Sequence, residues 1–316
     1  MMLYDFERVK IMKRLFITIG VFTMPFLTGC GWNPFGPGDG SEPPGFFPWP
    51  LGAIDYDPAW SPDGSTTIYY HAANYGDSTD TCGLYFINPD GTDRRLFLNA
   101  TVDNPDWSPD GEWIAFSSLH ACIWKIKVNG DSLTQLTFNR RTFCPDWSPD
   151  GKKIAYNQSV STETHPPGIW IMDADGSNDH LVFEGATCPD WSPDGSKIVR
   201  DGIYVADTNG TNTELIHQGG RHPVWSPDGS KIAFISTDEN EYGLWIMNSN
   251  GDNPHCLTQD ICFYPCSWSP DGEYIVYTSG LEGSTMIGDS AVYAPGDGRL
   301  WVINADGTDK YQLTFP

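Results

Sequence analysis

The chain has 316 residues, and its 41 Asp and Glu against 18 Lys and Arg give a formal net charge of -23 at pH 7. This composition argues against a nucleic-acid-binding protein, because such a protein needs a basic face to replace the counterions of the phosphates. The same charge would repel anionic lipid head groups, so surface charge alone would not hold the chain at a membrane.

The N-terminal segment has the features of an export signal. Met12-Lys13-Arg14 precedes a mainly apolar run from Leu15 to Phe26, which is too short for a permanent membrane span. We expect residues 1–30 to be a signal peptide, with Met12 as an alternative start of translation. The segment Leu27-Thr28-Gly29-Cys30 is similar to the signal of bacterial lipoproteins, which implies lipidation of Cys30. Ordinary cleavage near this point, with Cys30 unmodified, is the alternative.

Residues 31–50 are rich in Gly and Pro and show little periodicity, which predicts a flexible or semi-extended tether. Several lipid chains on one cysteine would hold the protein firmly at the membrane. Gly31 stands where some bacterial lipoproteins have the Asp that retains them in the inner membrane. In an organism with two membranes, this favours the outer membrane, with the protein facing the periplasm or the cell surface.

A pentapeptide repeat organises most of the remaining chain. Six copies of Trp-Ser-Pro-Asp-Gly begin at Trp60, Trp107, Trp147, Trp191, Trp225 and Trp268. Their spacing is close to the roughly 40–45 residues of a four-stranded propeller blade. Ser-Pro-Asp-Gly favours a tight turn, because Pro presets the backbone and Gly accepts a left-handed conformation. We expect this turn to join the inner strand of each blade, strand a, to strand b.

A second repeat recurs out of phase with the first. An aliphatic and an aromatic residue are followed by an Asn- or Asp-containing turn that ends in Gly, which predicts a hairpin between strands c and d. The copies begin at Leu84-Tyr85, Ile123-Trp124, Ile169-Trp170, Ile203-Tyr204, Leu244-Trp245 and Leu300-Trp301. Six copies of each motif predict an all-β fold, a six-bladed β-propeller of four-stranded antiparallel blades over residues 51–316.

The two motifs resemble the WD-like propeller repeats of TolB-type proteins and of many secreted or lipid-anchored bacterial proteins. The resemblance covers about residues 51–316 and implies the propeller fold, but it is weakly specific for function. TolB-type proteins carry an additional α/β domain before the propeller, for which this sequence has no room. The sequence also lacks the Gly-x-Ser-x-Gly elbow of the hydrolase domains that accompany similar propellers in peptidases.

Antiparallel strands place the repeated a–b and c–d turns on one face and the variable b–c and d–a loops on the other. Binding residues usually lie on variable loops, so we expect this loop face to carry the function. The candidate ligand or partner residues near the mouth of the central channel are Asp55, Asp57, Asp103, Asn104, Arg140, Arg141, Arg221, His222, Phe263 and Tyr264. The arginines suggest an anionic ligand or an acidic partner segment, with ordinary solvated loop charges as the alternative.

No catalytic residue, metal site or cofactor is predicted. The Asp-rich turns lack the terminal bidentate Glu of a calcium loop, and the cysteines lack the paired Cys-x-x-Cys arrangement of a zinc site. Cys144 and Cys188 share one slot, three residues before the tryptophan, and disulfide pairing stays open. Four histidines are expected on the loop face, at positions His71, His120, His165 and His222.

These observations predict a lipid-anchored, monomeric propeller of the cell envelope that is not an enzyme and binds a protein or peptide through the loop face. The alternative is a propeller enzyme that acts on acidic polysaccharide, because some propeller lyases hold a metal with histidines at the channel mouth. A hydrolase-associated propeller with a metal at the same place belongs to this alternative. A purely structural role in an envelope assembly is a third hypothesis.

Overall fold

The computed structural model describes residues 53–73, 79–118, 121–138, 141–236, 238, 242–260, 262, 264–280, 285–287, 290–292 and 298–315. All regular elements in these residues are β-strands. Nowhere among them is there a helix long and apolar enough to cross a membrane. The expected signal peptide and the tether lie outside the described residues, and so do four predicted residues, Cys30, His120, Arg140 and Phe263.

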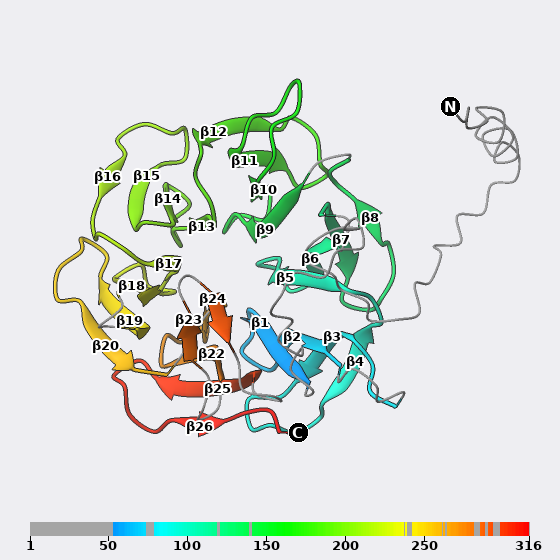
Figure 1. The fold of residues 1–316 in the computed structure, drawn as a ribbon. Helices are drawn as coiled ribbons and strands as arrows, with labels where there is room; N and C mark the ends of the chain where they lie inside the picture. Colours follow the sequence, from blue (N-terminus) through cyan, green and yellow to red (C-terminus); the bar gives the residue numbers. More distant parts are fainter. Residues whose placement is uncertain are drawn as a thin grey trace, which may run out of the picture.

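Four successive segments of the chain each form a separate four-stranded antiparallel sheet (Figure 1). The first consists of β5 (Val102–Trp107), β6 (Trp113–Ser118), β7 (Ile123–Lys127) and β8 (Thr134–Gln135). The second consists of β9 (Thr142–Trp147), β10 (Lys153–Gln158), β11 (Gly168–Asp173) and β12 (His180–Glu184). The third consists of β13 (Asp190–Trp191), β14 (Lys197–Arg200), β15 (Tyr204–Asp207) and β16 (Glu214–Leu215). The fourth consists of β17 (Arg221–Trp225), β18 (Lys231–Ser236), β19 (Gly243–Asn248) and β20 (His255–Thr258).

The two ends of the described chain share an eight-stranded sheet. One half contains β1 (Ile54–Trp60), β2 (Thr67–Ala72), β3 (Gly83–Ile87) and β4 (Arg95–Leu98). The other contains β21 (Ser267–Trp268), β22 (Tyr274–Gly280), β25 (Gly298–Asn304) and β26 (Tyr311–Gln312). Each half is antiparallel, and one parallel pair between Ile54 and Gly298 joins them. A small hairpin of β23 (Thr285–Ile287) and β24 (Ser290–Val292) lies between β22 and β25 in sequence.

Figure 1 shows these sheets arranged around a central axis, with the first strand of each at the inside of the ring. The predicted all-β class and the four-stranded antiparallel blade are therefore confirmed. The core lies between blades, where apolar side chains of neighbouring sheets pack together. In one such layer, Ile68 and Phe86 of the first blade pack with Trp107 and Ile114 of the next.

The predicted a–b turns are present and are held by their own side chains. In one copy, the Ser192 hydroxyl donates to Asp194 at 2.7 Å, and the Ser192 oxygen accepts the Lys197 N–H at 2.9 Å. Asp194 also accepts the Ser196 N–H, and Gly195 has a φ of 71°. These hydrogen bonds, that from the Ser196 N–H first, lower the pKa of Asp194 to about 2. The repeated aspartates thus stabilise the turns through local hydrogen bonds.

At four junctions, neighbouring inner strands are tied together by the side chain of the residue that precedes a repeat tryptophan. Asp106, Asp146 and Asp190 each accept the backbone N–H of the tryptophan in the next blade at 2.7 Å. At the junction of the two chain ends, Ser267 Oγ accepts the Trp60 N–H at 3.1 Å. The buried Arg299 donates to the Ala53 carbonyl beside this junction. The ring therefore closes through side-chain and backbone contacts, and none of the described strands is exchanged between the first and last blades.

Candidate functional site

The residue three positions before the tryptophan has the same unusual backbone in five inner strands. These residues have φ values between 49° and 53° and are followed by proline; they are Asp57, Asn104, Cys144, Cys188 and His222. Positive φ is uncommon for residues other than glycine. In β1, β5, β9 and β17 it coincides with a shift of the strand register, an irregularity that can re-aim a side chain. We call these five residues the axial ring.

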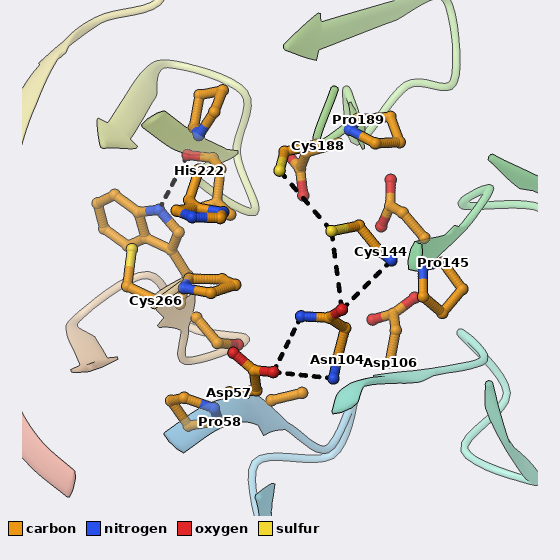
Figure 2. Close-up of a pocket in the computed structure, with 18 of the residues that line it drawn as sticks. Asp57, Pro58, Asn104, Asp106, Cys144, Pro145, Cys188, Pro189, His222 and Cys266 are labelled. Atoms are coloured by element: carbon orange, nitrogen blue, oxygen red, sulfur yellow. Dashed lines mark hydrogen bonds between the residues drawn. The ribbon is translucent and has the colours of Figure 1, made fainter. Parts of the chain in front are cut away.

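The axial ring lines an open cavity of about 250 Å³ between the inner strands. Figure 2 shows the five side chains converging on one space from different strands. Asp106, Asp146, Asp190 and Cys266 also line the cavity, together with the proline of each inner strand. A rigid apolar wall of prolines thus presents several carboxyl and thiol groups toward the axis.

Hydrogen bonds connect consecutive members of the axial ring (Figure 2). Asp57 Oδ2 accepts both the backbone N–H and the side-chain amide N–H of Asn104 at 2.9 Å. The other side of Asn104 faces Cys144, whose N–H donates to Asn104 Oδ1 at 3.4 Å. The Sγ atoms of Cys144 and Cys188 are 3.7 Å apart, which is a thiol contact and not a disulfide bond. Four blades are therefore linked by one polar chain.

The chain continues to His222 and Asp201. The backbone N–H of His222 donates to Asp201 Oδ1 at 2.7 Å, and the Thr187 hydroxyl donates to Asp201 Oδ2 at 2.8 Å. The side-chain donor atoms of Cys188, Asp201 and His222 all lie within 4.8 Å of one another. Burial by itself would lower the pKa of His222, but Cys188 and Asp201 outweigh it, so this pKa is raised. The hydrogen bond with Cys144 and burial raise the pKa of the Cys188 thiol.

The carboxyl groups of the cavity have strongly raised pKa values. Burial, with the charge of Asp103, raises the pKa of Asp57 to about 8. Burial raises the pKa of Asp106 to about 7 and that of Asp190 to about 8. Burial and the charges of the neighbouring Asp190 and Asp106 also raise the pKa of Asp146. The cavity wall can therefore gain or lose protons near neutral pH, unlike the turn aspartates.

Comparison with known proteins identifies the repeat. Residues 157–293 match the family described as the TolB beta propeller domain. Over these residues, the repeats of this chain are similar to those of TolB-type propellers. An uncharacterized protein of Agrobacterium fabrum is 31% identical over 136 residues, which are 40% of this chain and 45% of that protein. This chain thus matches less than half of the length of that relative.

Solved structures share the propeller fold of this chain. TolB from Acinetobacter baumannii has a TM-score of 0.60 and 20% identity, over 83% of this chain and 64% of that one. A structure described as TolB from Agrobacterium tumefaciens has a TM-score of 0.57 and 22% identity, over 70% of this chain and 84% of that one. Oligogalacturonate lyase from Vibrio parahaemolyticus has a TM-score of 0.52 and 14% identity, over 84% and 79%. At these identities the similarity establishes the fold alone.

Five of the predicted loop-face residues gather near the axis of the propeller. Asp57, Asn104 and His222 line the cavity directly. Asp103 accepts the Tyr56 hydroxyl at 3.0 Å, and Tyr264 stacks on Tyr56 with ring centroids 4.4 Å apart. Tyr56, which the sequence did not single out, therefore joins Asp103 and Tyr264 to the same side of the site.

The other described candidates lie elsewhere. Asp55 is buried, with its Oδ1 2.6 Å from His71 Nδ1 and its Oδ2 3.9 Å from Arg299 Nη1, so it belongs to the junction of the chain ends. Arg141 and Arg221 are exposed, and neither lines the cavity. His71 and His165 contact Asp55 and Asp179, respectively, and do not line it either. The histidines that were expected on the loop face are thus not gathered at one centre in the part of the chain described.

Sequence reasoning missed most of the cavity wall. Asp106, Asp146 and Asp190 were not proposed, and Cys144 and Cys188 were noted only for their shared slot. The available signal was the tripeptide x-Pro-Asp before the tryptophan, at Asn104, Cys144 and Cys188. This tripeptide marks a slot that recurs in three blades, but the left-handed backbone that turns the side chain inward leaves no mark in composition.

Proposed function

We propose that this chain is a non-enzymatic binding propeller of the bacterial cell envelope, attached by a lipid on Cys30, that receives a basic segment of a partner protein or peptide. The observation that carries the proposal is the convergence of Asp57, Asp106, Asp146 and Asp190 on one axial cavity. Its volume of about 250 Å³ is below the roughly 300–1,000 Å³ of typical small-molecule pockets. It therefore suits a single side chain or a chain end.

The proposed occupant is cationic because of the groups at the cavity wall. No Lys or Arg is found among the described residues that line it. At neutral pH, a carboxyl group with a pKa of about 7 is half protonated and one with a pKa of about 8 is mostly protonated, so the free protein holds less buried charge than its aspartates would otherwise give. An ammonium or guanidinium group that enters would favour their ionised form and form charge-assisted hydrogen bonds. The anionic occupant suggested by the arginines has no comparable support, because Arg141 and Arg221 lie outside the cavity.

We further propose that the ring has six blades, with the eight-stranded sheet counted as two. Each half of that sheet is an antiparallel four-stranded unit with its own Trp-Ser-Pro-Asp-Gly turn, and one residue pair joins the halves. A six-fold arrangement of inner strands supports a narrow channel, in keeping with the small cavity.

Peptide binding to the purified full chain tests the proposed function. We expect lysine-rich octapeptides to bind and acidic octapeptides of equal length not to bind, as measured by calorimetry. Asp57→Asn and Asp106→Asn should each weaken binding about tenfold or more, because each removes a carboxylate that would pair with the cation. The control Asp110→Asn, in an a–b turn, should bind as the parent chain does.

Two outcomes would contradict this function. One is equal binding of basic and acidic peptides, and the other is an equal loss in the Asp110→Asn control. A screen of the same protein with acidic oligosaccharides examines the enzymatic alternative. Cleavage of the oligosaccharides to unsaturated products would show a lyase activity and would contradict a non-enzymatic function.

The lipid attachment is tested separately. We expect the mature N-terminal peptide to begin at Cys30 and to carry the added mass of acyl chains in mass spectrometry. We also expect Cys30→Ser to move the protein from the membrane fraction to the soluble fraction. An unmodified N-terminal peptide from a membrane-bound protein would refute the attachment.

A further inference from the structure

We propose that Cys188, His222 and Asp201 form a binding site for a zinc-like divalent cation at the rim of the axial cavity. Cys144 is the proposed fourth ligand. This site goes beyond the proposed peptide-binding function and does not depend on it. It also differs from the sequence-based expectation of no metal, because its ligands come from three separate segments that no spacing rule connects.

The first support is the geometry of the donor atoms. One sulfur, one imidazole nitrogen and one carboxylate oxygen lie within 4.8 Å of one another, so small side-chain rotations can bring them onto one ion. Cys144 Sγ lies 3.7 Å from Cys188 Sγ, a separation compatible with two thiolates on one tetrahedral centre. Figure 2 shows Cys144, Cys188 and His222 around the same space, on the side of the cavity away from Asp57.

The second support is the chemistry of the donor set. Zinc sites are built from cysteine sulfur, histidine nitrogen and aspartate oxygen, usually with four ligands in a tetrahedron. Thiolate ligands disfavour magnesium and calcium, which prefer sites made only of oxygen. Two sulfurs, one nitrogen and one oxygen therefore select a soft or borderline ion over the hard ions that an acidic cluster would attract.

The third support is the rigidity of the ligands. Cys144, Cys188 and His222 share the left-handed backbone of the axial ring, and each is followed by proline. Asp201 accepts hydrogen bonds from the backbone N–H of His222 at 2.7 Å and from the Thr187 hydroxyl at 2.8 Å. Asn104 Oδ1 faces Cys144 from the other side. Such surrounding hydrogen bonds orient metal ligands and are a regular feature of real sites.

The test uses the purified full chain in detergent, reduced and freed of metal by a chelator. Zinc ions are then titrated in competition with a chromophoric chelator, and bound zinc is counted by mass spectrometry. We expect one zinc ion per chain. Cobalt ions in place of zinc should give the near-ultraviolet sulfur-to-cobalt charge-transfer band of a thiolate ligand. Cys188→Ser and His222→Gln should each lower zinc affinity at least a hundredfold and weaken or remove this band.

Matched variants separate loss of a ligand from loss of fold. Cys266→Ala alters another thiol of the same cavity and should keep the zinc ion and the cobalt band. Circular dichroism of each variant without metal shows whether the propeller is intact. The site is refuted if the reduced parent chain binds no zinc, or if folded Cys188→Ser binds it as tightly as the parent. It is also refuted if Cys266→Ala lowers the affinity as much as Cys188→Ser does.

Discussion

Asp57 shows how one residue of the axial ring combines strain, burial and charge. Its backbone is left-handed, its carboxyl group is buried, and only one of its two oxygens has a partner among the described residues. Asn is among the few residues that tolerate this backbone, and its amide nitrogen could replace a protonated oxygen. Asp57→Asn is therefore a close mimic of the neutral carboxyl group.

The pH dependence of stability tests this description of Asp57. Its folded pKa of about 8 lies above the ordinary value of about 3.9, so the folded state binds the proton more tightly. The stabilisation is complete below pH 4 and is lost as the pH rises through 8. Asp103 faces this group and titrates with it, because burial also raises the pKa of Asp103, whereas the raised pKa values of Tyr56 and Tyr264 keep both phenols neutral in this range. In the parent chain, this group should lower the free energy of unfolding by up to about 1.4 kcal/mol per pH unit between pH 5 and 8. We expect denaturant unfolding of Asp57→Asn to show that this part of the slope is missing.

A turn aspartate provides the control for this experiment. The pKa of Asp194 is lowered to about 2, so its contribution is present above pH 4 and is lost as the pH falls toward 2. Asp194→Asn should therefore leave the slope between pH 5 and 8 unchanged. If Asp57→Asn keeps the full slope of the parent chain in this range, the claim that Asp57 is protonated in the folded protein is wrong.

The strands show what the sequence could and could not predict at the scale of elements. The a–b turns were predictable, because Ser, Asp and Gly are used there for local hydrogen bonds and a positive φ, as at Ser192 and Gly195. The alternating b strands were predictable for the same local reason. The inner strands were not fully predictable, because their register shifts depend on packing against neighbouring blades.

That difference explains the mixed outcome for the candidate site. Asp57, Asn104 and His222 were found because the d–a loops lead into the inner strands. Asp201 was missed because it lies between β14 and β15, and only the assembled ring brings it to the His222 N–H. Arg221 lies directly before His222 in sequence, but a strand turns neighbouring side chains to different sides, and Arg141 lies three residues before Cys144.

At the scale of the whole molecule, the two faces of the ring have different chemistry. The repeated turns use their aspartates internally, whereas the axial cavity holds aspartates whose protons are exchangeable near neutral pH. Contacts between the first and last blades close the ring, so the inner strands form a continuous rigid wall. A rigid wall with titratable groups suits binding without a large change of shape.

Hydrogen exchange of the full chain with and without a lysine-rich peptide tests the central claim, that the axial cavity and not the repeated turns binds the partner. We expect the peptide to slow exchange in the inner strands, above all β1 (Ile54–Trp60) and β5 (Val102–Trp107), which carry Asp57 and Asp106. The a–b turns at residues 61–65 and 108–112 should exchange at an unchanged rate. Slower exchange confined to those turns, with the inner strands unaffected, would contradict the account.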